Sequence, residues 1–196
     1  MTTTEVQVLE NVWIPVDAST RLSARIWLPQ PATAKYSVVL EYIPYRSLLW
    51  EYTPQELQDG VKVIEWLANQ SWSSGRVGVF GKSWGGFNGL QLAAMDPPAL
   101  RGVVSLYSID DRYADDVHYM NGAVLGSETL SWATVMFSLN ALPMAPETVG
   151  SEEEWKLRWQ ERLEKQFPWL QQWLTHQTRD EFWKHGSICE NYDKVK

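Results

Sequence analysis

Apolar positions over the first thirty residues follow the pattern of β-strands. β-Branched and aromatic residues gather over 6–9, 11–15 and 21–28, and the last segment begins with alternating apolar and polar positions. A period of two is typical of an antiparallel strand with one face in water. We therefore expect an N-terminal β-meander, with residues 17–19 as the turn before its last strand.

The middle of the chain alternates strands and helices. Residues 36–43, 76–80 and 100–107 are short, nearly continuous apolar runs, which predict strands buried on both faces of a parallel sheet. Helical patterns lie between them, over 53–70 and from 84 to about 95. This alternation indicates an α/β fold with right-handed crossovers.

The first of these helices has a clear start. Thr53 is the expected N-cap, Pro54 occupies the first helical position, and Glu56 completes a capping box. Apolar residues then recur at spacings of four, three and four, which predicts one buried face: Leu57, Val61, Ile64 and Ala68.

Strand patterns stop after residue 110. Helical spacing covers 128–139, 151–166 and 168–178, and residues 151–154 (SEEE) are a strong helix start. Aromatic and apolar residues form two stripes, one of Trp155, Trp159, Leu163 and Phe167, and one of Trp169, Trp173 and Phe182. We expect residues 110–190 to form a Trp-rich helical cap packed over the sheet.

Composition and charge narrow the function classes. Of 196 residues, 44% are apolar and 21% are charged, which is typical of a globular domain. The net charge of −7 argues against nucleic acid and anionic membrane surfaces as partners. Twelve tryptophans favour a Trp-rich core over the alternative of an aromatic-lined pocket.

Cysteine and histidine usage predicts no metal site and no cofactor. Cys189 is the single cysteine, so no internal disulfide forms, and three scattered histidines make no ligand set. The N-terminus shows no signal peptide, and no apolar stretch approaches the roughly 20 residues that span a bilayer. We expect a soluble, cytoplasmic protein.

One short motif indicates a catalytic site. Residues 81–85 (GKSWG) have the form G-x-S-x-G, follow a predicted buried strand and open a helix. In that context the turn raises Ser83 above the sheet edge as a nucleophile, and the backbone N–H of Trp84 faces a developing oxyanion. The alternative is a plain hydroxyl on a capped helix.

The chain resembles the X-Pro dipeptidyl-peptidase-like acyl hydrolases, the family that includes bacterial cocaine esterase. The resemblance rests on residues 43–46 (IPYR), 78–89, 110–119, 176–177 and 183–187. It implies an α/β-hydrolase that cleaves a small ester or amide through an acyl-enzyme, with a Ser-His-Asp triad and no cofactor. It implies that Ser83 is the nucleophile and that the Tyr45 hydroxyl joins the Trp84 N–H in the oxyanion hole. The alternative for Tyr45 is an aromatic side chain packed at a strand end.

The chain departs from the family at two places. Between Arg46 and Glu51 a loop, a buried strand and a turn are absent, so the N-terminal strands lose the neighbour that joins them to the sheet. The chain also stops at Lys196, before the family's catalytic acid and histidine. We therefore expect a partial α/β-hydrolase core over 1–109, a cap over 110–190 and a truncated return to the core over 191–196.

Other residues are weak substitutes for the missing triad members. Four aspartates follow a strand end, where crowding predicts at least one raised pKa, although pairing with Arg112 or the cap is their expected role: Asp110, Asp111, Asp115 and Asp116. His118, His176 and His185 lie in the cap, and Lys82 points away from Ser83.

Three functional hypotheses follow. The first is a serine esterase or X-Pro peptidase-like hydrolase. The second is an inactive remnant or a module that binds small ligands. The third is half of a split enzyme completed by a neighbouring reading frame. The sequence leaves open the oligomeric state and the choice between esterase and peptidase.

Overall fold

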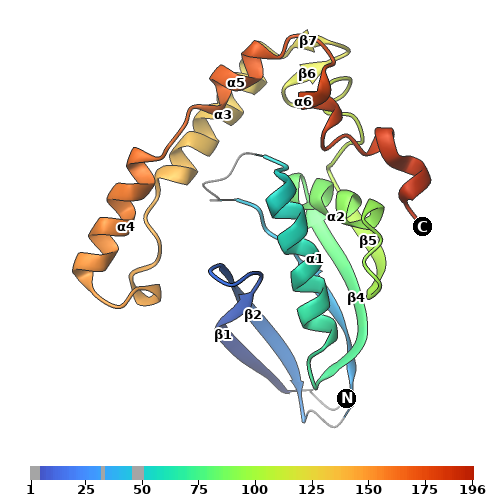
Figure 1. Ribbon diagram of the computed structural model, residues 1–196, viewed down its shortest axis with the longest axis vertical. Helices are drawn as coiled ribbons and strands as arrows, with labels where there is room; N and C mark the ends of the chain where they lie inside the picture. Colours follow the sequence, from blue (N-terminus) through green and yellow to red (C-terminus); the bar gives the residue numbers. More distant parts are fainter. Residues whose placement is uncertain (1–4, 32–33, 46–50) are drawn as a thin grey trace.

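The computed structural model describes residues 5–31, 34–45 and 51–196 (Figure 1). Arg46 and the shortened loop 47–50 lie outside the described residues. The described chain forms a β-hairpin, a small α/β layer and a helical region that extends away from it (Figure 1). None of its described helices is both long and apolar enough to cross a membrane.

The N-terminal segments form a two-stranded hairpin instead of a meander. The two segments expected at 6–9 and 11–15 are one strand, β1 (Glu5–Pro15), which pairs antiparallel with β2 (Arg21–Gln30). Its register shifts between Leu9 and Val12, where Asn11 has a φ of 52°. A β-bulge of this kind adds a residue without ending the strand, so a break in the apolar pattern imitates a turn.

The central layer is the predicted parallel sheet. Its strands are β3 (Tyr36–Glu41), β4 (Ser73–Lys82) and β5 (Leu100–Leu106), paired in that order. Helices α1 (Pro54–Ala68) and α2 (Trp84–Ala94) follow β3 and β4. Both cover the same face, because their buried side chains share one core with the inward residues of the strands. This confirms the α/β class.

The opposite face of this sheet is open, which corrects the expectation of strands buried on both faces. Val39, Phe80 and Val104 point away from the helices and are 77%, 36% and 54% exposed. Both helices pack on one side, and no described element covers the other. The hairpin β1–β2 is also a separate sheet, as the absence of a joining strand predicts.

The start of α1 is confirmed, but its acidic residue acts differently from a capping box. The Thr53 hydroxyl accepts a hydrogen bond from the Glu56 backbone N–H at 3.2 Å. The Glu56 side chain turns inward, where its carboxylate accepts a hydrogen bond from Asn88 Nδ2 at 2.8 Å. The predicted apolar face is confirmed in part: Ile64 is buried, and Val61 and Ala68 pack partly buried against the same core. The fully buried positions beside Ile64 are Val63 and Leu67, which were not predicted.

Glu56 makes the stability of this layer depend on pH. Burial raises the pKa of Glu56 to about 7, from 4.5 in an unfolded chain. Between these values the folded state resists ionisation, so its free energy of unfolding falls as pH rises from 4.5 to 7. Glu56→Gln removes this cost and should raise the unfolding free energy at pH 8 by roughly 3 kcal/mol, with no gain at pH 4. Chemical denaturation at both pH values measures the difference.

The exposed Glu65 on the same helix provides the control. Glu65→Gln removes a carboxylate that is 64% exposed and pairs with Lys62 at 3.8 Å. A change within about 0.5 kcal/mol is expected at both pH values. An equal effect of the two substitutions would show that the Glu56 carboxylate carries no buried cost.

The helical region begins with a short hairpin of β6 (Tyr119–Met120) and β7 (Ala123–Val124). Three helices agree in place with the predicted ones: α3 (Gly126–Ala141), α4 (Glu152–Glu164) and α5 (Trp169–Thr175). The short helix α6 (Glu181–Lys184) and the 3-10 turns η1 (Pro146–Thr148) and η2 (Ile188–Lys194) were not predicted. Ser151 caps α4 as expected, since its hydroxyl accepts a hydrogen bond from the Glu154 N–H.

The two aromatic stripes have different environments. Trp169 and Trp173 are buried and pack with Trp84 and Phe87 of α2, so this stripe covers the start of α2 instead of the sheet. No residue of α4 is buried, and α4 lies far from the sheet, beyond α3 (Figure 1). The expectation of a cap packed over the sheet is therefore wrong for α4.

Candidate active site

Ser83 occupies a strained turn between β4 and α2. Its backbone angles are φ 53° and ψ −125°, which a side chain other than glycine adopts at a cost of roughly 1–3 kcal/mol. The turn needs glycine at position 81, where a side chain would meet backbone, and it is tight at Gly86, where one would meet serine hydroxyls. A Cβ on Gly81 would lie 2.2 Å from the Gly85 carbonyl oxygen, and one on Gly86 would lie 2.7 Å from the Ser105 hydroxyl oxygen. The predicted strand–turn–helix context of Ser83 is thus present.

Trp84 and Tyr45 lie together beside this turn. Trp84 is the first residue of α2, so its N–H is one of the unpaired donors at a helix N-terminus. The Tyr45 ring meets the Trp84 ring edge-to-face with centroids 5.7 Å apart, and contacts Trp132 of α3 in the same way at 6.2 Å. Tyr45 is half-buried in the turn that follows β3 (Tyr36–Glu41), and its ring packs against Trp84, which adjoins Ser83.

A cavity of about 370 Å³ opens over Ser83. That volume is enough for a small organic ligand. Its walls are aromatic and acidic: they include Trp84, Phe87, Tyr107, Trp132, Glu51, Asp115, Asp116 and Glu128. His118 is the histidine among the lining residues.

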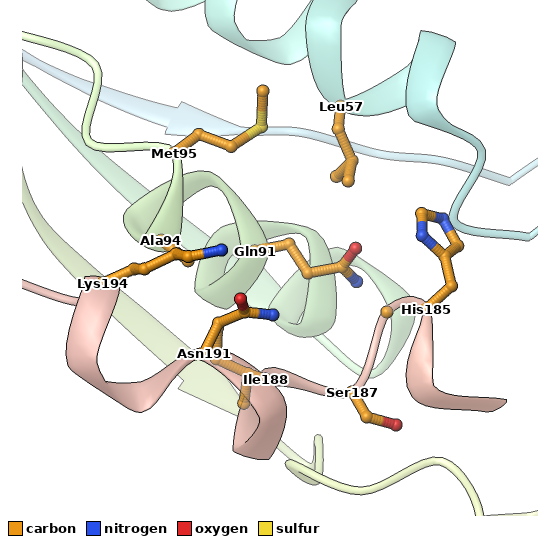
Figure 2. A pocket seen from close by; sticks show the side chains of 10 residues that line it. Leu57, Gln91, Ala94, Met95, His185, Ser187, Ile188, Asn191 and Lys194 are labelled. Carbon is orange, nitrogen blue, oxygen red and sulfur yellow. The ribbon is translucent and has the colours of Figure 1, made fainter. Parts of the chain in front are cut away.

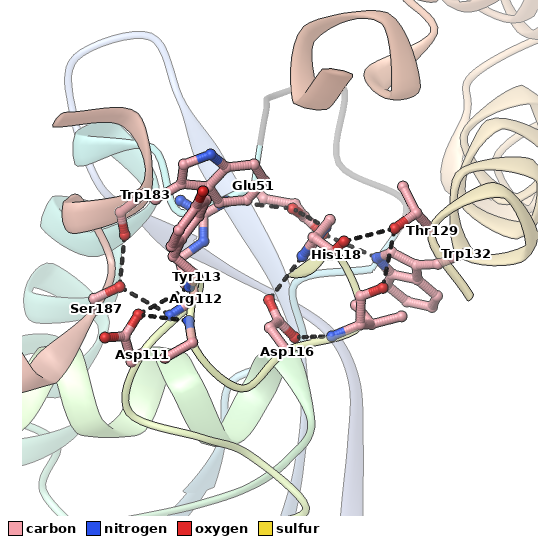
Figure 3. A network of polar contacts seen from close by, with 12 residues as sticks. Glu51, Asp111, Arg112, Tyr113, Asp116, His118, Thr129, Trp132, Trp183 and Ser187 are labelled. Atoms are coloured by element: carbon pink, nitrogen blue, oxygen red, sulfur yellow. Dashed lines mark hydrogen bonds and ion pairs between the residues drawn. The ribbon is translucent and has the colours of Figure 1, made fainter. Parts of the chain in front are cut away.

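A buried charged cluster borders this cavity, and Glu51, Asp116 and His118 of that cluster line it (Figure 3). We call Glu51, Arg112, Asp116 and His118 the Glu51 cluster. One Glu51 oxygen lies 3.2 Å from His118 Nε2 and 3.6 Å from Arg112 Nη2, and the other accepts a hydrogen bond from Trp132 Nε1 at 3.0 Å. His118 Nδ1 lies 2.7 Å from Asp116 Oδ2. Two cations and two anions therefore compensate one another in the interior.

The cluster keeps His118 protonated at neutral pH. Burial alone lowers the pKa of His118, but the Glu51 charge and the hydrogen bond with Asp116 outweigh it and raise the pKa to about 9. Burial likewise raises the pKa of Glu51, and the facing charges of His118 and Arg112 bring it below its usual value. His118 is then a cation at pH 7 and cannot accept the proton of Ser83.

The other histidines are also engaged elsewhere. His176 Nδ1 lies 2.6 Å from Asp180 Oδ2, and its ring stacks on Phe182. His185 Nε2 contacts the Tyr52 carbonyl oxygen. In the part of the chain that the structure describes, no hydrogen bond joins Ser83 to any of the three histidines.

Among the four aspartates that follow β5, Asp111 has a lowered pKa, whereas crowding predicted that at least one pKa would be raised. Burial raises the pKa of Asp111, but the N–H groups of Tyr113 and Ala114 and the guanidinium of Arg179 outweigh it and lower that pKa. Arg179 Nη2 lies 3.1 Å from Asp111 Oδ2, so Asp111 pairs with the helical region, which is the second of the two expected partners. Among described residues, no cluster of His, Cys, Asp or Glu has the arrangement of a metal site.

Comparison with known proteins decides the family. The family model of the X-Pro dipeptidyl-peptidase (S15) family matches residues 47–196, which is most of the chain. The chain belongs to this family. The Ser83 turn and Trp84 lie inside the matched range, and Tyr45 lies just before it.

Curated relatives share a stretch of sequence with this chain, and solved structures share its fold. Proteins named as serine esterases from Mycobacterium bovis and Mycobacterium tuberculosis are each 31% identical over 65 residues, 33% of this chain and 10% of theirs. A CocE/NonD family hydrolase from Staphylococcus aureus matches 97% of this chain with a TM-score of 0.73 and 18% identity. An α-amino acid ester hydrolase matches 98% with a TM-score of 0.70 and 19% identity. The S15 chain described here spans 40% and 41% of these two structures.

Sequence reasoning missed the Glu51 cluster. Glu51 stands alone in a segment without periodicity, and more than sixty positions separate it from His118. The residues 110–119 that carried the family resemblance hold the other three members, but no spacing rule connects them to Glu51. Trp132, which contacts both Tyr45 and Glu51, was likewise not predicted.

Proposed function

We propose that this S15-family chain is a serine hydrolase that cleaves a small ester or amide through an acyl-enzyme on Ser83. The observation that carries the proposal is the strained Ser83 turn, with its φ of 53° between a strand and a helix N-terminus. A serine held in this way projects its hydroxyl and places the next backbone N–H toward the same reacting atom.

In this mechanism, Ser83 Oγ attacks the substrate carbonyl carbon and forms a bond as the carbonyl oxygen becomes an anion. The Trp84 N–H and the Tyr45 hydroxyl donate hydrogen bonds to that oxygen. The carbon–oxygen or carbon–nitrogen bond then breaks, and the leaving group takes a proton. Water attacks the acyl group and frees Ser83.

The proton of Ser83 needs an acceptor, and the described histidines do not supply one. Water then accepts it, and the remaining rate comes from the oxyanion donors and from binding. Hydrolases without a complete triad keep roughly 10³–10⁴-fold over the uncatalysed reaction. We therefore propose slow acylation, with the second candidate being a module that binds an acyl ligand in the same cavity. His118 held as a cation favours that second candidate.

Acylation by an activated ester distinguishes the slow hydrolase from the binding module. Incubation with p-nitrophenyl acetate should add one acetyl group to the intact chain, located by peptide mass spectrometry on Ser83. Ser83→Ala should remain unmodified while still binding a non-hydrolysable amide of the same shape. Acetylation that persists in Ser83→Ala would contradict the hydrolase proposal. An unmodified wild-type chain that binds the amide would favour the binding module.

A further inference from the structure

A second cavity, of about 170 Å³, lies between α1, α2 and the C-terminal segment η2 (Figure 2). Leu57, Met95 and Ile188 contribute apolar walls, and Asn191 and Lys194 contribute polar groups. None of the described residues that line it is acidic. The cavity is on the same helix as Ser83, but Gln91 is eight residues further along, or about 12 Å along the axis.

Gln91 is the unexplained group at this cavity. Gln91 is only 7% exposed, and neither its Nε2 nor its Oε1 has a hydrogen-bond partner among the described residues. The carboxamide points along the cavity toward His185 (Figure 2). His185 cannot satisfy it with Nε2, because that nitrogen contacts the Tyr52 carbonyl oxygen. A buried amide with both ends unpaired costs free energy, so a bound molecule that pairs with it is stabilised.

The chemistry of Gln91 limits what such a molecule can be. It must accept a hydrogen bond from Nε2 and donate one to Oε1 at the same time. A carboxylate accepts only and leaves Oε1 unpaired, whereas an ammonium donates only and leaves Nε2 unpaired. A primary carboxamide does both through one planar edge. The cavity has room for only a few water molecules, each of which takes up about 30 Å³, so a bound ligand must be small.

We propose that this cavity binds a small primary carboxamide, with Gln91 pairing to its amide group. The apolar remainder of the ligand lies against Leu57, Met95 and Ile188. This site is separate from the cavity over Ser83 and does not depend on the proposed hydrolase function.

The test titrates the ¹⁵N-labelled full chain with three molecules of equal size: propionamide, propionate and propylammonium. The side-chain NH₂ signals of Gln91, identified by their loss in Gln91→Met, should shift saturably with propionamide. Propionate and propylammonium should bind at least about tenfold more weakly, because each leaves one buried group unpaired. Equal shifts with all three, or none, would overturn the proposal and leave ordered water as the occupant.

Two variants keep the result interpretable. Gln91→Met retains the side-chain length and removes groups that bond to nothing in the protein, so it should fold and lose propionamide binding. Ala94→Leu fills the cavity, retains Gln91, and should also abolish binding. Unchanged propionamide affinity in both folded variants would place the binding elsewhere and refute the site.

Discussion

Glu51→Ala is expected to destabilise the chain by about 3–5 kcal/mol at pH 7, because it leaves buried cations without their shared anion. Arg112 and His118 are each 1% exposed in their side chains, and Glu51 contacts both. Arg112 also lies over the Tyr52 ring at 4.4 Å and donates hydrogen bonds to the carbonyl oxygens of Phe182 and His185. Loss of Glu51 therefore affects the junction between the core and the helical region. Urea unfolding followed by tryptophan fluorescence measures the loss.

The pH profile distinguishes this cluster from ordinary packing. The pKa of His118 is raised above its unfolded value of 6.5, so its stabilisation is fully present below pH 6.5 and is lost as pH rises through about 9. In Glu51→Ala the decline should still begin near pH 6.5 but should be smaller and end at lower pH, because the main charge that raises the pKa of His118 is gone. A parallel pH profile in the two proteins would contradict this role of Glu51.

The exposed pair Glu10–Arg25 supplies the control. Its side chains are 53% and 58% exposed and lie 2.6 Å apart across the N-terminal hairpin. Glu10→Ala should therefore change the free energy of unfolding by less than about 1 kcal/mol. Similar losses from both glutamates would show that the Glu51 cluster is no more important than a surface ion pair.

Gly81→Ala should have the second large effect, on both stability and chemistry. The added Cβ meets the backbone of Gly85 at 2.2 Å, and a backbone atom cannot move aside as a flexible side chain can. We expect a loss of about 3 kcal/mol, at the upper end of what overpacking costs. The shifted turn should also slow the acylation of Ser83 by roughly a hundredfold.

Gly102→Ala is the matched control for this substitution. Gly102 lies in the neighbouring strand β5, and a Cβ there would meet nothing within 4 Å. Its unfolding free energy and acylation rate should stay close to those of the wild type. A tolerated Gly81→Ala, with Ser83 acylated at the normal rate, would show that the turn does not need its close backbone approach.

Local features of the fold were predictable from the sequence. The Ser83 turn depends on glycines within three residues and on the strand and helix that flank it, and all of this is visible in the sequence. The N-caps Thr53 and Ser151 are equally local, and both are confirmed. These features were predictable because the residues that specify each of them lie within a few positions of it.

Features set by distant contacts were not predictable. The apolar run 36–43 has the pattern of a strand buried on both faces. Val39 is nevertheless exposed, because α1 and α2 both pack on the opposite face of the sheet. The stripe starting at Trp155 is regular, yet no residue of α4 is buried. The indoles of Trp155 and Trp159 donate hydrogen bonds to the carbonyls of Met144 and Ala141, at and just beyond the end of α3. The division of the chain at residue 110 remains a prediction.

The most direct measurement is labelling of the purified chain with a fluorophosphonate probe, beside Ser83→Ala. We expect a single adduct, located by mass spectrometry on Ser83 and absent from the variant, formed slowly because no described histidine activates the hydroxyl. An adduct at another residue, or no adduct in a chain that circular dichroism shows to be folded, would contradict the assignment of Ser83 as the nucleophile.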